Sequence, residues 1–85
     1  MTLSIILMHL EDLAHKLELE LVYDILDDEE FIIKSGICHL NGKPLIIVDK
    51  RKSIEEKIRI LVDILSNFNT DNIYILPEIR KLLKN

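Results

Sequence analysis

The residues that decide the fold run from Phe31 to Glu56 and read FIIKSGICHLNGKPLIIVDKRKSIEE. Asn41-Gly42 separates two apolar runs, and both residues readily take the positive φ angles of a type I′ turn. The pattern therefore predicts a β-hairpin with strands over 31–40 and 45–49. Directly after it, Ser53 followed three residues later by Glu56 forms a capping box, which predicts a helix from Ile54 to about Asn67.

The two-residue turn also predicts the register of the hairpin, because it determines which residues lie opposite one another. The expected pairs are Leu40 with Lys43, Cys38 with Leu45, Gly36 with Ile47, and Lys34 with Asp49. The alternate residues should form the core side of the sheet: Phe31, Ile33, Ile37, Ile46 and Val48. Pro44 lacks an N–H group that could point away from the hairpin partner, so we expect an edge strand over Leu45 to Val48.

The flanking segments complete the expected order of elements. Apolar residues at helical spacing predict a first helix capped by Ser4 and ending near Leu17 or Leu19. Alternation predicts a strand over 21–26, with Leu21, Tyr23 and Ile25 on one face. After a short extended segment at 73–76, Pro77 suits the first position of a last helix whose Ile79, Leu82 and Leu83 point inward.

These elements indicate an α+β fold: a helix, a three-stranded antiparallel meander, a helix, a short extended segment and a C-terminal helix. At 85 residues, with no repeat or break in composition, we expect one domain over 1–85. The single cysteine excludes an intrachain disulfide, and a small domain without such cross-links is typical of the reducing cytosol.

Charge and hydropathy argue against two classes of partner. The net charge is −4, and the one basic run, Lys50-Arg51-Lys52, has no neighbouring aromatic residue, so we expect no nucleic-acid binding. The apolar start of the chain has no basic lead-in and is soon followed by Glu11 and Asp12, so we expect neither a signal peptide nor a membrane span. Nine of the acidic residues precede Phe31, and such an asymmetry fits either contact within the fold or assembly of several copies.

Some apolar residues exceed what one small core needs. Ile5 and Met8 fall near the polar side of the first helix, and Ile60 and Ile64 widen the apolar stripe of the second to more than half its circumference. We interpret these four residues as a possible interface, through which the chain contacts another copy of itself or another protein.

The residues that could carry chemistry do not converge. Cys38 and His39 are adjacent on a strand, so their side chains point to opposite faces. His9 and His15 lie about 120° apart around the first helix, whereas a helical metal pair needs residues i and i+4. The acidic turn at 27–30 lacks the glycine and alternating oxygen ligands of a calcium loop. We therefore predict no catalytic, cofactor-binding or metal-binding residues and no cofactor.

A resemblance to a known family points to the same scaffold. Leu13-Ala14, a strand, Ser35-Gly36-Ile37, a hairpin strand ending at Asp49, and an apolar helix follow one another as in the ImmA/IrrE-type zinc metallopeptidase domain, which the chain resembles in order and spacing. In that family the helix carries H-E-x-x-H, whose histidines bind zinc while the glutamate activates water. Alignment of the apolar stripes puts Val62, Asp63 and Ser66 at those three positions.

The resemblance therefore implies a degenerate relative without zinc ligands. The alternative is a residual metal-dependent hydrolase that uses His39, Cys38 or Asp63. The strand pair Gly36–Cys38 and Asn41–Lys43 is also similar to short bacterial proteins of uncharacterised families, a likeness that implies no activity. Our interpretation of the sequence is a small cytosolic domain that acts through protein contact, by self-association or with another protein, and is not an enzyme.

Overall fold

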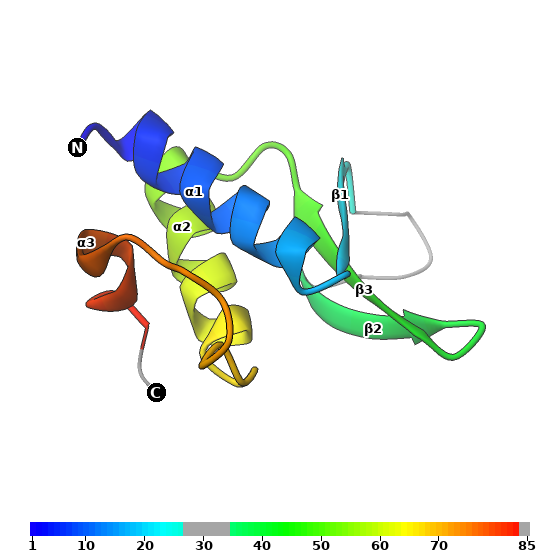
Figure 1. Ribbon diagram of the computed structural model, residues 1–85. Coiled ribbons are helices and arrows are strands. Elements are labelled where there is room, and N and C mark those ends of the chain that lie inside the picture. The colour runs from blue at the N-terminus through cyan, green and yellow to red at the C-terminus, as the bar shows by residue number, and fades with distance from the viewer. Residues whose placement is uncertain (27–34, 84–85) are drawn as a thin grey trace.

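Three helices and three strands make up the part of the chain that the computed structural model describes, residues 1–26 and 35–83. In chain order they are α1 (Leu3–Lys16), β1 (Glu20–Asp24), β2 (Gly36–Leu40), β3 (Lys43–Asp49), α2 (Ile54–Leu65) and α3 (Pro77–Arg80). Helices α1 and α2 pack against each other beside the sheet, and α3 packs against α1 (Figure 1). The expected α+β class is confirmed, and residues 73–76 form neither helix nor strand.

The hairpin has the predicted turn and register. Asn41 and Gly42 both take positive φ angles, 54° and 80°, as a type I′ turn requires. Leu40 pairs with Lys43, Cys38 with Leu45, and Gly36 with Ile47. The predicted pair Lys34–Asp49 and the core positions Phe31 and Ile33 involve residues outside the described ranges.

The prediction of an antiparallel meander is wrong, because β1 pairs with β3 in parallel and the strand order is β1-β3-β2. The register runs from Glu20 opposite Leu45 to Asp24 opposite Asp49, so β3 is the central strand over 45–49. The predicted edge at Leu45 to Val48 is therefore also wrong. Pro44 lies one residue before the first pair with β1, so its missing N–H costs the sheet no hydrogen bond.

The helices begin and end close to the predicted positions, with two differences. Thr2, not Ser4, caps α1: its Oγ1 accepts a hydrogen bond from the Ile5 N–H at 3.2 Å. Ser53 caps α2 as predicted, since its Oγ accepts from the Glu56 N–H at 3.2 Å. Helix α2 ends at Leu65, two residues early, and the Ser66 hydroxyl donates to the Val62 carbonyl at 2.6 Å, which occupies a backbone acceptor of the last turn.

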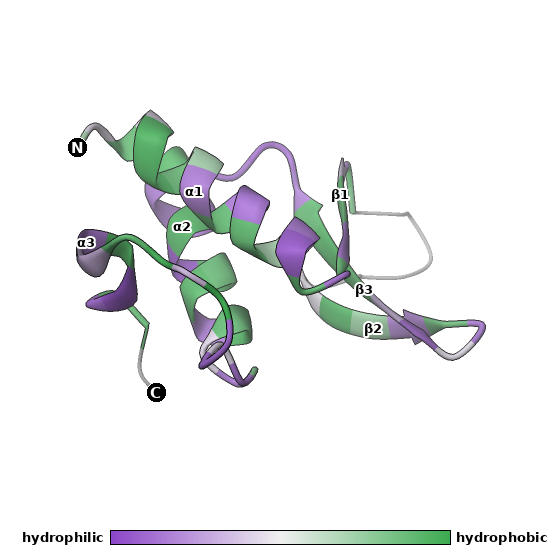
Figure 2. Cartoon of the chain, in the orientation of Figure 1, coloured by the Kyte–Doolittle hydropathy of each residue, from purple (hydrophilic) through white to green (hydrophobic). Residues whose placement is uncertain are grey.

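The core lies between the two long helices, the sheet and α3, and its largest fully buried side chains are Leu10, Ile46, Val48, Leu61, Leu65 and Ile79. The largely apolar segment that leads into α3 closes this core, and apolar and polar residues form separate stripes along α1 and α2 (Figure 2). Ile79 and Leu83 are buried as expected. Leu82 is not, because α3 is a single turn and the residues after it no longer follow a helical face.

Candidate functional site

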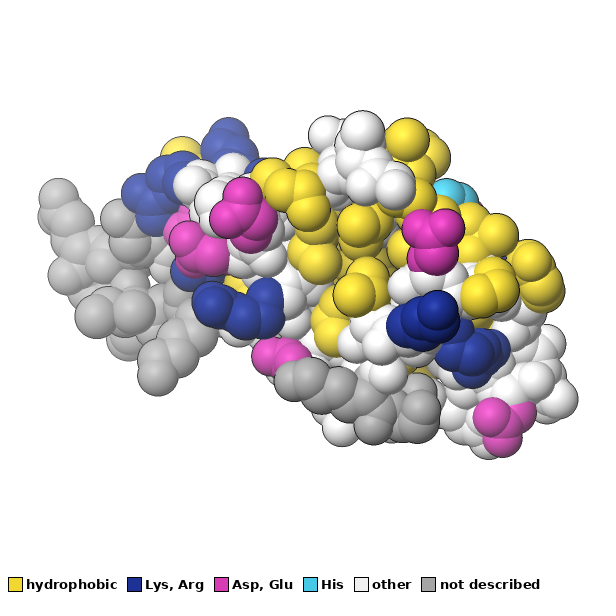
Figure 3. Space-filling view, turned by 90° about the vertical axis from the view of Figure 1, so that its left-hand side faces the viewer, with side chains coloured by type: hydrophobic (Ala, Val, Ile, Leu, Met, Phe, Trp, Pro, Cys, Tyr) yellow, Lys and Arg dark blue, Asp and Glu magenta, His cyan; other side chains and the backbone are white. Residues whose placement is uncertain are grey.

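Beyond its first residue, Leu3, which is 43% exposed, α1 carries two apolar side chains that point away from the core. Ile5 is 41% exposed and Met8 is 56% exposed, whereas Leu10, Leu13 and Ala14 on the other side of the same helix are buried. Figure 3 shows the face that carries the N-terminal end of α1 and α3, where apolar side chains gather across the middle with charged groups around them. We call Ile5 and Met8 the α1 face.

A groove continues from the α1 face toward the C-terminal half of the helix. His9, one turn after Ile5, lines it together with Asp12, Leu13 and Lys16, and the residues opposite them are Tyr74, Ile75, Leu76 and Ile79. Its volume is about 240 Å³. Leu13 and Ile79 are buried beneath it, while Tyr74 is 76% exposed at its rim.

The rim of this groove, which we call the α1 groove, is polar and its charges are partly compensated. Lys16 and Asp12 form an ion pair of 3.2 Å across one helical turn. The groove thus has an apolar base and a rim that can form hydrogen bonds. Its size allows one or two apolar side chains of a partner to bind in it. The sequence did not predict this groove, because Tyr74–Leu76 is distant in sequence from α1. The one feature that could have indicated it is the apolar character of this segment, which has no strand or helix pattern of its own.

Ile60 and Ile64 differ from Ile5 and Met8. Both are partly buried and pack against the core of the same chain. Part of the apolar surplus that the sequence indicated on α2 is thus covered within the fold.

The residues considered for chemistry remain apart. Cys38 and His39 are both exposed on β2, and Cys38 is a free thiol. His9 lines the α1 groove, whereas His15 lies on the exposed side of α1. Among residues 1–26 and 35–83, no three His, Cys, Asp or Glu side chains come together as metal ligands would. The acidic turn at 27–30 lies outside those ranges.

The three positions that align with the zinc motif lie at the end of α2 and directly after it, and they hold no ligand cluster. Val62 is buried in the core, and Ser66 directs its hydroxyl to the Val62 carbonyl. Asp63 is exposed. These three residues therefore do not converge as metal ligands would, and they lend no support to the alternative hypothesis of a residual hydrolase.

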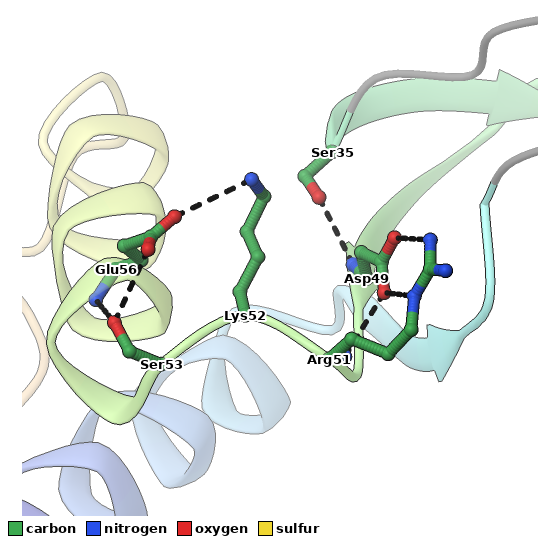
Figure 4. Close-up of polar contacts among 6 residues, drawn as sticks. All are labelled: Ser35, Asp49, Arg51, Lys52, Ser53 and Glu56. Carbon is green, nitrogen blue, oxygen red and sulfur yellow. Dashed lines mark hydrogen bonds and ion pairs between the residues drawn. The ribbon is translucent and has the colours of Figure 1, made fainter.

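The basic run follows β3 and leads into α2, and most of its charge has a partner (Figure 4). The Arg51 guanidinium forms two hydrogen bonds to the Asp49 carboxylate, at 2.7 and 3.0 Å, and Lys52 lies 3.5 Å from Glu56. Hydrogen bonds from Arg51 hold the pKa of Asp49 well below its usual range. The Asp49 N–H donates to the Ser35 hydroxyl at 2.9 Å, which ties the start of β2 to the end of β3. These contacts give the run a structural role at the junction of sheet and helix.

A second polar cluster joins three elements. The Tyr23 hydroxyl on β1 donates to the Glu11 carboxylate on α1 at 2.5 Å, and the Lys57 ammonium on α2 lies 5.4 Å from the centre of the Tyr23 ring. Burial, followed by the hydrogen bond and charge of Glu11, raises the pKa of Tyr23 far above its usual value. This cluster links the edge strand β1 to both long helices.

None of the described helices combines the length and the apolar character needed to cross a membrane. Comparison with models of protein families gave no match, and neither did searches of curated proteins and of solved structures.

Proposed function

We propose that this chain is a small non-catalytic domain of the cytosol that acts through contact with protein, and that the α1 face and the α1 groove form its contact surface. We place neither nucleic acid nor membrane among its partners. The observation that carries the proposal is the exposure of Ile5 and Met8 beside the groove that Tyr74 borders. Large apolar side chains that cluster around a shallow groove are typical of protein interfaces.

The chemistry of the surface supports a protein partner more than a small molecule. At about 240 Å³ the groove is smaller than most ligand sites, and its polar groups are on the rim, not at the base. An exposed tyrosine next to apolar side chains is the composition that interfaces favour. We propose self-association as the first use of this surface, because it needs only the chain itself.

Light scattering after size exclusion, over a range of protein concentrations, tests the proposal with the double variant Ile5→Lys, Met8→Lys. We expect the variant to show a lower mass than the wild-type chain at the same concentration, because two charges would have to be desolvated in the contact. The matched control is His15→Lys, Glu18→Lys, which adds two lysines to exposed positions at and just after the C-terminal end of α1, away from the α1 face.

At a concentration where each protein is monomeric, the circular dichroism spectrum and the urea midpoint of each variant should remain close to those of the wild type, because all four side chains are exposed. If the double variant keeps the wild-type mass while the fold is intact, self-association through the α1 face is contradicted.

A further inference from the structure

The outer edge of β2 is a second surface without a partner among the described residues. β2 pairs only with β3, and four of its five residues are exposed. Leu40 is 60% exposed and Ile37 is 42% exposed. We infer that a second copy of this chain adds to β2 in antiparallel orientation, which would give one continuous sheet of six strands with Cys38 on the two-fold axis.

The backbone of β2 has the groups that such an addition needs. In an antiparallel pair, residues alternate between those that exchange hydrogen bonds with the partner strand and those that do not. Pro44 has no N–H, which matches a pair of the second kind opposite His39. The N–H and C=O groups of His39, and two residues earlier those of Ile37, therefore point to the open side of β2.

The two edges of the sheet are not equally protected against strand addition. β1 begins and ends with a carboxylate, Glu20 and Asp24, and Tyr23 within it is tied to Glu11. β2 contains no Lys, Arg, Asp or Glu at all. Charged residues on an edge strand prevent pairing with other chains, so of the two edges only β2 is open to it.

A second copy fits this edge because the strand complements itself. With Cys38 on the two-fold axis, Ile37 of each copy exchanges hydrogen bonds with His39 of the other, and Cys38 faces its own equivalent. In the same register Leu40 lies opposite Gly36 of the second copy. Gly36 has no side chain, and the space above it is open.

The side chains on that face of the sheet then form continuous rows. Ile47 pairs with Gly36 within one copy, so Leu40 of the other copy extends the row Val22, Ile47, Gly36 and covers Ile47 from the side. Leu40, the most exposed aliphatic side chain of the strand, thereby gains apolar neighbours. No like charges come to face each other between the two strands, because neither strand carries an ionised side chain at these positions.

This inference does not depend on the α1 face, since Ile5 and Met8 are on α1 and β2 contacts α2 instead. Its first test is oxidative cross-linking. Cys38 is the only cysteine, so a disulfide-linked dimer can form only between two Cys38 residues. Across a non-hydrogen-bonded antiparallel pair the Cα atoms are about 4.5 Å apart, within the range of a disulfide.

Treatment with diamide joins the two sulfur atoms, as each thiol gives up a proton and an electron to the oxidant. We expect rapid formation of a covalent dimer by the wild-type chain. The control is the variant Cys38→Ser, Lys43→Cys, which moves the thiol to an exposed position on β3 directly after the turn of the same hairpin. In the proposed register two such thiols are roughly 20 Å apart, so cross-linking should be several-fold slower. Equal rates for the two proteins would overturn the inference.

The second test measures association itself by light scattering. Cys38→Lys and Cys38→Glu each bring like charges face to face on the axis, and we expect each to weaken dimer formation about tenfold or more. A mixture of the two variants should dimerise again, whereas Cys38→Ser should behave as the wild type. The exposure of residue 38 makes all three variants compatible with the fold. A wild-type chain that stays monomeric, or charged variants that associate as it does, would overturn the inference.

Discussion

At the scale of single residues, the Tyr23 side chain on β1 makes a polar contact with α1. Its hydroxyl is part-buried and donates to Glu11, so a phenylalanine there leaves the carboxylate without that donor. We expect Tyr23→Phe to lower the free energy of unfolding at pH 7 by about 1 to 2 kcal/mol. Urea denaturation measures this, and Tyr74→Phe, at a highly exposed ring, is the control, with an expected change within about 0.5 kcal/mol.

The raised pKa of Tyr23 adds a pH dependence to the same prediction. In the unfolded chain the hydroxyl ionises near its ordinary value of about 10, while in the folded chain burial and Glu11 keep it protonated. The unfolded state therefore loses its proton first, and stability falls as the pH rises through about 10. The difference between wild type and Tyr23→Phe should shrink over that interval. A difference that stays constant up to pH 11 would contradict the assignment.

At the scale of elements, the helix caps show what local sequence can predict. Ser53 and Ser4 each precede an apolar helical pattern, but only Ser53 accepts a hydrogen bond from its helix. Ser4 lies inside α1, because Thr2 precedes it and has a side chain equally suited to the cap. Where two candidates are close together, the pattern alone does not decide between them.

The variant Ser53→Ala should therefore lower the free energy of unfolding by about 1 kcal/mol, since the Glu56 N–H loses its acceptor. Ser4→Ala should change it by less than about 0.5 kcal/mol. Thermal or urea denaturation of both variants measures the two changes in the free energy of unfolding. A loss at Ser53 no larger than about 0.5 kcal/mol would contradict a stabilising role for the cap hydrogen bond of α2.

The sheet shows which strand pairings local sequence cannot predict. The Asn41-Gly42 turn determined the β2–β3 register because the contact joins residues close in the chain. The pairing of β1 with β3 is not local, and no turn connects these two strands directly. The uninterrupted apolar run at 45–48 is typical of a central strand. That signal outweighs the single Pro44, which taken alone predicts an edge strand.

At the scale of the whole molecule, the question is which apolar side chains one small core needs. The structure measures 42 × 31 × 17 Å, so it is thin in one direction and leaves several large side chains at its surface. Helical periodicity correctly indicated that Ile5 and Met8 point outward. It could not show that Ile60 and Ile64 contact the core, because the neighbours that cover a helix come from other parts of the chain.

Stability measurements on truncated side chains separate these two groups. Ile64 packs against the core, so Ile64→Ala removes part-buried methyl groups and should lower the free energy of unfolding by about 1 to 3 kcal/mol. Met8→Ala, at a side chain more than half exposed, should change it by less than about 0.5 kcal/mol. Urea denaturation should be done at a concentration where light scattering shows a monomer, so that association does not contribute. If Ile64→Ala leaves the stability of the monomer unchanged but weakens association, Ile64 belongs to an interface, and the apolar stripe of α2 is wider than the fold itself requires.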